Sequence, residues 1–406
     1  MRGGSRRFRL PDAARMQVGI VADDLTGAMD AAAPFADIGI GTVVALHCDS
    51  ALPTSAAVLS IDTDTREATR QDASDTVRRT MAKLRAAGAR LLFKKIDSTL
   101  RGNIGAETLA ALAGSGCRCA IVAPAAPAQG RLLRDGQLFV HGRRLPMNLT
   151  DLLRFELPDV SVQPLLPSSR PVAPPGDGCA VWVADAQDEA DLDRVARLGW
   201  DQEDILLVGS SGLAGALARQ PGIALSSGQP GRQPGYRRVW FVVGSRNSRS
   251  AQQVRALIAH GDVMSVVLPL AGHMPEPCAR GGSGDRGVGV IHVEGLDAPT
   301  AGDPQRIAAQ LGEIAATMLG LAPQARTALV LTGGDTARAT LARLGVERVD
   351  VLASLSPGVV HGAARVAGQE LGVVTKAGGF GDPDLFVRLA AQLGGAPEVP
   401  AQRQKD

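Results

Sequence analysis

Two adjacent carboxylates are the first residues along the chain whose types and spacing can do chemistry. They are Asp23 and Asp24 in the run ADDLTG at 22–27, between a short apolar run and a stretch of helical period. Such residues are expected at the carboxyl end of a strand, where open α/β sheets bind ligands. Adjacent carboxylates can accept a proton from a hydroxyl or hold a cation. Asp24 or Thr26 can equally be a plain N-cap of the following helix, and the motif alone favours neither role.

A denser charged cluster follows in the run KKIDSTLRGN at 94–103. Two ammonium groups, a carboxylate, two hydroxyls and a guanidinium fall within eight residues, after an apolar run that starts at Leu91. Arg101 can bind a carboxylate through two parallel hydrogen bonds, whereas Lys95 acts as a point charge toward a phosphate or a developing oxyanion. This composition is typical of a site for a polyhydroxylated anion, although a solvated charged loop has the same composition.

Lysine is scarce in this chain, which makes its positions informative. Of the 43 Lys and Arg residues only five are lysines, at 83, 94, 95, 376 and 405. Positions 94, 95 and 376 all fall within candidate site motifs, the last of them in a glycine-containing turn. A guanidinium cannot replace a compact ammonium in a tight phosphate or hydroxyl site, so the pattern indicates a functional role for these three lysines.

Three glycine-containing turns lie in the C-terminal half of the chain. They are VVGSRNS at 242–248, LTGGDTA at 331–337 and TKAGGFG at 375–381, and the first two separate a predicted strand from a predicted helix. Backbone N–H groups at such helix starts are ready anion-binding sites. None of the turns matches GxxxxGK[ST] or GxGxxG, so neither a P-loop nor a dinucleotide fingerprint is indicated. Each alone is typical of a tight connection, but three in one small domain favour a nucleotide.

Other candidate residues carry less weight. Arg131, in PAAPAQGR at 124–131, is either a substrate contact or an ordinary surface arginine. The six histidines show no HxH or HExxH spacing, so no metal site is expected. Ser210 and Ser211 lie outside a GxSxG motif and lack a matched His and Asp, so neither is interpreted as a nucleophile. The five cysteines are expected to be reduced thiols, since disulfides are rare in cytosolic proteins.

The elements that must position these residues recur as a short apolar strand, a Gly-bearing turn and a helix. This unit is predicted at 18–33, 206–218, 239–258 and 328–344. Further strands are predicted at 41–46, 57–61, 91–95, 119–123, 181–184, 263–268, 288–293 and 371–375, with helices at 72–87 and 304–319. The alternation predicts an α/β fold with mostly parallel sheets covered by helices.

Length and composition breaks predict two domains. A chain of 406 residues exceeds what one core comfortably serves, given about 150 residues per domain. The strongest break is the Pro-, Gly- and Ser-rich stretch 220–238, which we expect to link a first domain at 17–219 to a second at 239–395. Residues 1–16 are expected to be a disordered extension, with Met16 as an alternative start, and residues 396–406 a tail.

Composition argues against several partners. The formal net charge of +2 and the 3% of aromatic residues argue against nucleic acid as the default partner, and no segment has the roughly 20 apolar residues that a membrane span needs. Arg6 and Arg7 resemble a twin-arginine export signal, but no long apolar run follows them, so a cytoplasmic location is expected. A small-molecule ligand is predicted instead, and a homo-oligomer is left open.

Seven motifs in order carry a resemblance to a known family. ADDLTGAMDAA, FKKIDSTLRGN, PAAPAQGR, LLVGSSGLAGALA, VVGSRNSRSAQQ, LTGGDTA and VTKAGGFG, from about residue 17 to 392, resemble the four-carbon acid sugar kinase family. The resemblance implies ATP-dependent phosphorylation of the C4 hydroxyl of threonate, erythronate or a 3-oxo-tetronate. It also implies an N-terminal sugar-acid domain, a C-terminal nucleotide domain and a cleft between the two.

The resemblance carries over residue by residue. On the sugar-acid side it points to Asp24, Lys95 and Asp97 as catalytic residues and to Asp23, Ser98 and Arg101 as substrate-binding residues. On the ATP side it points to Ser245, Gly333, Gly334, Asp335, Thr336 and Gly379, with Lys376 nearby. The turn after Ser245 departs from the family pattern, because Arg246, Asn247 and Ser250 fill the stretch where a small residue and a later Thr are usual.

A mechanism follows as a hypothesis. Asp24 orients or deprotonates the C4 hydroxyl, Arg101 binds the substrate carboxylate, Lys95 neutralises developing charge, and Mg²⁺ bridges the ATP phosphates. Asp23 or Asp97 can instead be the base. Two further function classes stay open: a non-catalytic sugar-acid sensor, and an NAD-dependent oxidoreductase, whose glycine fingerprint this sequence lacks. We rank the kinase first.

Overall fold

The chain divides into two units. The computed structural model describes residues 16–50, 52–53, 56–166, 170–202, 204–221, 223, 235–261, 263–269, 287–295, 303–320 and 326–394. Unit 1 comprises 1–230 together with 347–360, and unit 2 comprises 231–346 together with 361–406. Residues 1–15 of the predicted extension, most of the predicted linker and the predicted tail lie outside the described residues.

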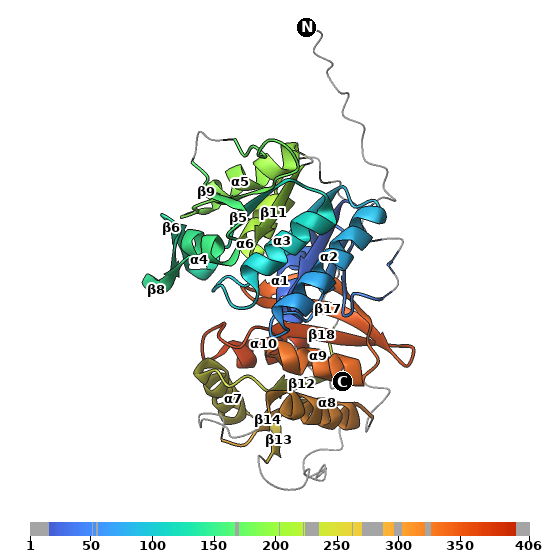
Figure 1. The fold of residues 1–406 in the computed structure, drawn as a ribbon. Coiled ribbons are helices and arrows are strands. Elements are labelled where there is room, and N and C mark those ends of the chain that lie inside the picture. Colours follow the sequence, from blue (N-terminus) through green and yellow to red (C-terminus); the bar gives the residue numbers. More distant parts are fainter. Residues whose placement is uncertain are drawn as a thin grey trace, which may run out of the picture. The chain divides into compact units, whose positions relative to one another are not determined.

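Unit 1 is built on one large sheet, whose strand order is β16-β2-β3-β1-β4-β11-β5-β10-β9 (Figure 1). All neighbouring pairs in it are parallel except β16 with β2. The strands are β1 (Val18–Ala22), β2 (Thr42–Ala45), β3 (Val58–Asp62), β4 (Leu91–Lys95), β5 (Cys119–Ala123), β9 (Ser161–Pro164), β10 (Ala180–Val183), β11 (Ile205–Gly209) and β16 (Arg348–Ser356). Their near-continuous apolar sequences are those of strands buried on both faces.

Helices cover both faces of this sheet. The first layer contains α1 (Leu25–Asp37), α5 (Glu189–Asp201) and α6 (Ser211–Ala218), and the second contains α2 (Arg70–Ala86) and α3 (Ile104–Ser115). Within the layers, α6 packs against α1 and α5, and α2 packs against α3. The chain moves along the sheet in both directions: toward β16 through α1 and α5, and toward β9 through α2 and α3. Because crossovers between parallel strands are right-handed, the two sets of helices lie on opposite faces.

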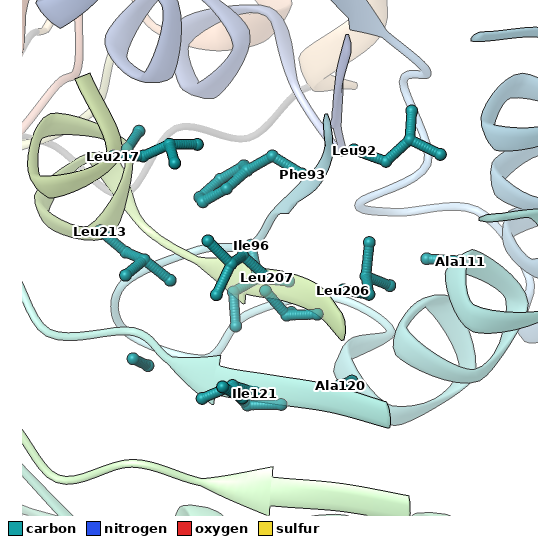
Figure 2. Close-up of a cluster of buried hydrophobic side chains, with 14 of the residues drawn as sticks. Leu92, Phe93, Ile96, Ala111, Ala120, Ile121, Leu206, Leu207, Leu213 and Leu217 are labelled. Carbon is teal, nitrogen blue, oxygen red and sulfur yellow. The ribbon is translucent and has the colours of Figure 1, made fainter. Parts of the chain in front are cut away.

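The core of unit 1 shows this division directly in Figure 2. Successive residues of a strand point to opposite faces, so Phe93 and Leu207 face Leu213 of α6, whereas Leu92 and Leu206 lie toward α3. All five of these side chains are buried. The packing fixes the register of β4 and β11, and with it the place at which each strand ends.

A small antiparallel sheet and a short helix form an excursion from unit 1. Its elements are the 3₁₀ turn η1 (Pro127–Gln129), β6 (Arg131–Arg134), β7 (Gln137–Val140), β8 (Arg143–Asn148) and α4 (Leu149–Glu156). Asn148 caps α4, because its side chain accepts hydrogen bonds from the backbone N–H groups of Thr150 and Asp151.

Unit 2 repeats the α/β design in a sheet of order β13-β14-β12-β15-β18-β17. The pairs from β13 to β18 are parallel. Helices α7 and α10 pack together, as do α8 and α9. The elements are β12 (Arg238–Val243), α7 (Ser248–His260), β13 (Val263–Leu268), β14 (Gly287–Val293), α8 (Pro304–Gly320), β15 (Thr327–Thr332), α9 (Gly334–Arg343), β17 (Val359–Val366, of which unit 2 includes His361 onward), β18 (Gln369–Lys376) and α10 (Leu385–Gly394).

The predicted class, two α/β domains with mostly parallel sheets flanked by helices, is confirmed. One segment differs from the sequence-based domain boundaries. Strand β16 pairs antiparallel with β2, with Val349 opposite Val44, so 347–360 belongs to unit 1 although it lies within the range predicted for the second domain. The Asp37 carboxylate at the end of α1 also accepts hydrogen bonds from the backbone N–H and hydroxyl of Ser354, at 2.7 Å each.

Candidate active site

The charged motifs of unit 1 converge at one edge of its sheet. Strand β1 lies between β3 and β4, and in this parallel register Ala22 is level with both Asp62 and Lys95. The three loops that leave these strands therefore start side by side at their carboxyl ends. They carry Asp23 and Asp24 after β1, Arg66 after β3, and the segment 96–103 after β4.

Arg66 is the centre of this cluster, and the sequence analysis did not single it out. Its guanidinium donates to both oxygens of Asp23, with Nε–Oδ2 at 2.7 Å and Nη2–Oδ1 at 3.0 Å. It also donates to both oxygens of Asp24, with Nη1–Oδ2 at 2.7 Å and Nη2–Oδ1 at 2.8 Å. A third carboxylate, that of Asp97, lies 3.9 Å from Nη2. One planar cation thus holds two adjacent carboxylates in a fixed orientation.

Asp24 is at once a member of this cluster and a helix cap. Its Oδ1 accepts the backbone N–H of Gly27 at 2.8 Å, and its Oδ2 accepts the hydroxyl of Thr26 at 2.6 Å. Asp24 therefore fills the cap role, and the same side chain belongs to the charged cluster. The N-cap position fixes the carboxylate at the start of α1, which is where Arg66 meets it.

Asp97 forms the second half of the cluster. It accepts the Nε and Nη2 groups of Arg101 at 3.0 and 2.8 Å, together with the backbone N–H and the hydroxyl of Thr99. Arg101 is the exposed member, with 65% of its side chain accessible against 9% for Asp97. In this structure its guanidinium fork binds Asp97, so a substrate carboxylate would have to share or replace that partner.

Two carboxylates of this cluster, those of Asp23 and Asp97, are held in their charged form. Burial alone would raise the pKa of Asp23, but the charge of Arg66 and then that of Lys94 outweigh burial and lower it. Burial likewise opposes ionisation of Asp97, yet the hydrogen bonds and charge of Arg101, followed by the charge of Arg66, keep its pKa well below the usual range. Both groups are consequently acceptors, not proton donors, at neutral pH.

The two adjacent lysines point to opposite faces of the sheet. Lys94 is fully buried on one face, where its Nζ lies 2.7 Å from Glu107 Oε2 of α3 and donates to the Lys95 carbonyl at 2.7 Å. Lys95 is on the other face and donates to the Ile96 carbonyl at 2.9 Å. A Cβ atom on Gly27 would be only 3.0 Å from Lys95 Nζ, so this ammonium lies beside the start of α1 and the Asp24 carboxylate. Lys95 therefore lies beside Asp24, while Lys94 acts on the cluster through its charge, which lowers the pKa of Asp23.

The loop after β4 supplies the remaining predicted residues. Ser98 is buried in it, and Leu100 adopts φ 65°, a left-handed conformation that is costly for a residue with a side chain. Gly102 has φ 88°, and a Cβ there would be 3.5 Å from Asp23 Oδ2, so the loop closes directly over the cluster. Arg131 begins β6, where its Nη1 donates to Gln129 Oε1 at 2.6 Å. Burial lowers the pKa of Arg131, while the charges of Asp97 and Asp30 oppose that lowering.

In unit 2 the three glycine-containing turns also meet at one sheet edge. Strands β12, β15 and β18 are neighbours, and their last residues Val243, Thr332 and Lys376 are in register. The turns that follow begin at Gly244, Gly333 and Ala377. The N-termini of α7 and α9, whose backbone N–H groups attract anions, start at the same edge.

The glycines of these turns allow unusually close packing around Ser245. A Cβ on Gly378 would lie 2.1 Å from Ser245 Oγ, and a Cβ on Gly333, where φ is 99°, would lie 3.6 Å from Ser245 N. A Cβ on Gly244 would lie 2.1 Å from Thr336 Oγ1 in the first turn of α9. The three turns are thus in mutual contact, and only glycine leaves the backbone exposed for a ligand to approach.

The other predicted residues of unit 2 differ in exposure. Gly334 begins α9, and Asp335 is exposed in its first turn. Gly379 lies against Asn247, since a Cβ there would be 3.2 Å from Asn247 Nδ2. Lys376 is fully buried, and its ammonium donates to the Gly378 carbonyl at 2.9 Å.

Arg66 lies in the run DTDTREAT at 62–69. It was missed because arginine is the usual basic residue of this chain, so a single arginine draws no attention. A usable signal existed, since this run follows the predicted strand 57–61 and so lies at the same sheet edge as the acidic motif. Among the described residues no group of three or more His, Cys, Asp or Glu side chains is arranged to hold a metal ion. None of the described helices combines the length and apolar character needed to cross a membrane.

Comparison with known proteins assigns a class to each unit. Residues 18–154 match a family model described as a sugar-binding N-terminal domain, and residues 290–386 match a nucleotide-binding C-terminal domain. A solved structure from Salmonella typhimurium shares the fold, with a TM-score of 0.73 at 21% identity over 93% of this chain and 99% of that one. The two family models thus define the class, a protein with a sugar-binding N-terminal domain and a nucleotide-binding C-terminal domain.

Two relatives narrow the class to a family. A D-threonate kinase of Bordetella bronchiseptica is 35% identical, covering 93% of this chain and 97% of its own length. A 3-oxo-tetronate kinase of Cupriavidus necator is 28% identical, covering 94% of this chain and 98% of its own. The chain belongs to the four-carbon acid sugar kinase family.

Proposed function

We propose that this protein transfers the γ-phosphoryl group of ATP to the C4 hydroxyl of a four-carbon sugar acid, with D-threonate as the first candidate substrate. The observation that carries the proposal is the Asp23, Asp24, Asp97, Arg66 and Arg101 cluster at the edge of the sugar-binding unit. D-threonate ranks first because the D-threonate kinases of three bacteria are 30 to 35% identical to this chain, against 28% for the 3-oxo-tetronate kinases. All of these relatives are kinases, which favours an enzyme over a non-catalytic sensor.

The proposed roles follow from the geometry of unit 1. Asp24 is oriented by its cap position and by Arg66, so it can accept a hydrogen bond from the C4 hydroxyl and take its proton as the O4–P bond forms. A strongly basic group is not required, because the transition state of phosphoryl transfer is loose. Asp23 and Asp97 are the alternative acceptors.

Two cations complete the proposed sugar-acid site. Arg101 is accessible enough to bind the substrate carboxylate, and Lys95 places an ammonium beside Asp24, where negative charge develops during transfer. Ser98 lines the same loop and can donate to a substrate hydroxyl. The buried Lys94–Glu107 pair supports the strand end, and the charge of Lys94 acts on Asp23.

The turns of unit 2 fit a nucleotide. Gly334 and Gly379 expose backbone at the edge formed by β12, β15 and β18, Gly333 links two of the turns by donating its N–H to the Lys376 carbonyl, and Ser245 and Thr336 place hydroxyls among them. Asp335 is an exposed carboxylate in the first turn of α9. A Mg²⁺ ion would neutralise phosphate charge when bound, and it would be held through the phosphates with one or two carboxylates such as Asp335.

The test is a turnover assay with identification of the product. Purified protein with ATP and Mg²⁺ is given D- and L-threonate, D- and L-erythronate and the 3-oxo-tetronates, with threitol as a neutral control. We expect ADP release with a sugar acid, far less with threitol, and a product with phosphate on C4 by ³¹P NMR. ADP release that is the same with and without every acid would refute the proposal.

A further inference from the structure

Lys376 stands out because the sequence analysis places it near the nucleotide, whereas the structure buries its side chain completely. It is the last residue of β18, at the edge where the three turns meet, and no part of it is accessible. The Gly333 N–H donates to the Lys376 carbonyl at 3.1 Å, so even its backbone links two of the turns.

The side chain of Lys376 acts on the third turn. Its Nζ donates to the Gly378 carbonyl at 2.9 Å and lies 3.4 Å from Ser250 Oγ. The Ser250 hydroxyl in turn donates to the same Gly378 carbonyl at 2.8 Å. Two donors from different elements therefore hold one peptide group, whose α-carbon faces Ser245 too closely for any side chain.

The surroundings keep the ammonium in place. Phe386 of α10 lies beneath it, with Nζ 5.6 Å from the ring centroid. Farther along the same turn, the Gln253 side chain donates to the carbonyls of Phe380 and Asp382 at 2.9 and 2.8 Å. Helix α7 thus supports the turn at two points, through Ser250 and Gln253, and Lys376 supports it from below.

We propose that Lys376 is a positioning residue, which fixes the turn 377–381 against the Ser245 turn through the Gly378 carbonyl and does not itself bind the nucleotide phosphates. The inference rests on the proposed function for the identity of the nucleotide. In this account Lys376 maintains the shape of the site by donating to a backbone carbonyl. Lys94 does the same in unit 1, where it donates to the carbonyl of Lys95 at the end of its strand.

The cost of burying this group supports a functional reason for keeping it. Burial lowers the pKa of Lys376 to about 7, and the charge of Arg249 acts in the same direction. Because its unfolded pKa is higher, the residue reduces folding stability at neutral pH. Lys376→Met is therefore expected to unfold at the same temperature as the parent or a higher one while binding ATP less well, which is not the signature of a residue kept for stability.

The experiment is a double-mutant cycle read by calorimetric titration with ATP and Mg²⁺, without sugar acid. Lys376→Met and Ser250→Ala are each expected to raise the Kd for ATP about tenfold. Because both side chains act through Gly378, the Kd of the double variant is expected to be no more than about threefold above that of the single variant that binds ATP less tightly. In a separate turnover assay with the sugar acid, the KM of each variant for that acid is expected to stay within about twofold of the parent value. Lys376→Arg is not expected to restore binding, since the enclosed space does not fit a guanidinium.

Lys83→Met is the matched control. The Lys83 ammonium also donates to two carbonyls, those of Cys48 and Ser50, but it belongs to unit 1, whereas the three turns belong to unit 2. We therefore expect the ATP affinity of Lys83→Met to equal that of the parent. Multiplicative effects in the double variant, restored binding in Lys376→Arg, or parental affinity in Lys376→Met would each overturn the inference. Since the titration contains no sugar acid, its result does not depend on turnover, and a failed turnover assay would count against the proposed function alone.

Discussion

The two candidate binding edges share the same sheet geometry, but one is formed by charged side chains and the other by backbone. In unit 1 the edge is formed by charged side chains, with one buried guanidinium holding two carboxylates and a second guanidinium holding a third. In unit 2 it is formed by backbone, and the side chains nearest to it are hydroxyls packed against glycines. The difference matches the ligands proposed for them. A sugar acid presents many hydroxyls and one carboxylate to be read individually, whereas a triphosphate is bound by N–H groups at helix starts.

Removal of the central cation should have the largest effect, and only in unit 1. Arg66→Ala leaves the buried carboxylate of Asp23 and the partly buried carboxylate of Asp24 without their main partner. We expect this to cost unit 1 about 3 to 5 kcal/mol of unfolding free energy and to abolish turnover. Chemical denaturation followed by fluorescence measures this loss. Arg78→Ala removes an exposed ion pair with Asp75 and should cost less than about 1 kcal/mol. Equal midpoints for the two variants would disprove the central role of Arg66.

The next largest effect should identify the base. Asp24→Asn keeps an oxygen for the Gly27 N–H, so the helix cap is preserved while the proton acceptor is lost. We expect kcat to fall by roughly 10²-fold with the KM for ATP unchanged. Asp23→Asn and Asp97→Asn are measured beside it. If either lowers kcat more than Asp24→Asn does, the base is that residue instead.

A smaller effect is expected where backbone alone forms the site. Gly378→Ala places a methyl group at the position 2.1 Å from Ser245 Oγ, so the turn must shift. We expect the KM for ATP to rise about tenfold while kcat at saturating ATP stays within about threefold. Gly320→Ala is the control, because a Cβ there meets nothing within 4 Å. An unchanged KM for ATP in Gly378→Ala would show that this turn is not part of the nucleotide site.

The smallest effect is the pH dependence of folding stability, which should distinguish unit 2 from unit 1 without any ligand. Burial lowers the pKa of His361 in unit 2 to about 4, and its Nε2 lies 2.8 Å from the Tyr236 hydroxyl. Between pH 6.5 and 4 the unfolded chain binds a proton at this histidine that the folded unit does not, so unit 2 loses stability as the pH falls through that window. The loss should be about 1 kcal/mol at pH 5.5.

Hydrogen exchange of buried amides, corrected for intrinsic rates, measures this loss in β12, with β1 as the internal reference. In unit 1 the lowered pKa values of Asp23 and Asp97 keep these two carboxylates ionised over the same range. His361→Gln should remove the slope in β12. A parallel loss in β1 would contradict the assignment of the effect to unit 2.

Much of the fold follows from local sequence, because buried parallel strands are short β-branched runs between turns. The predicted bounds of β4, β5 and β13 are those of the structure. Strand β16 was not predicted, since its place depends on β2, a partner about 300 residues away in sequence. Strand β17, which lies between β16 and β18, was not predicted either. The same limit explains the site. Motifs predict which charged residues gather at an edge, but which of them pair, and that Lys94 and Lys376 point away into the interior, depends on packing.

A crossed titration tests most directly the claim that each edge binds its own substrate. D-threonate and ATP are each titrated calorimetrically into the parent protein, Arg101→Ala and Gly378→Ala. We predict that Arg101→Ala weakens only the sugar acid, by about 1 to 2 kcal/mol because the side chain is largely exposed, and that Gly378→Ala weakens only ATP. Loss of ATP binding in Arg101→Ala, or of D-threonate binding in Gly378→Ala, would contradict the division of labour between the two units.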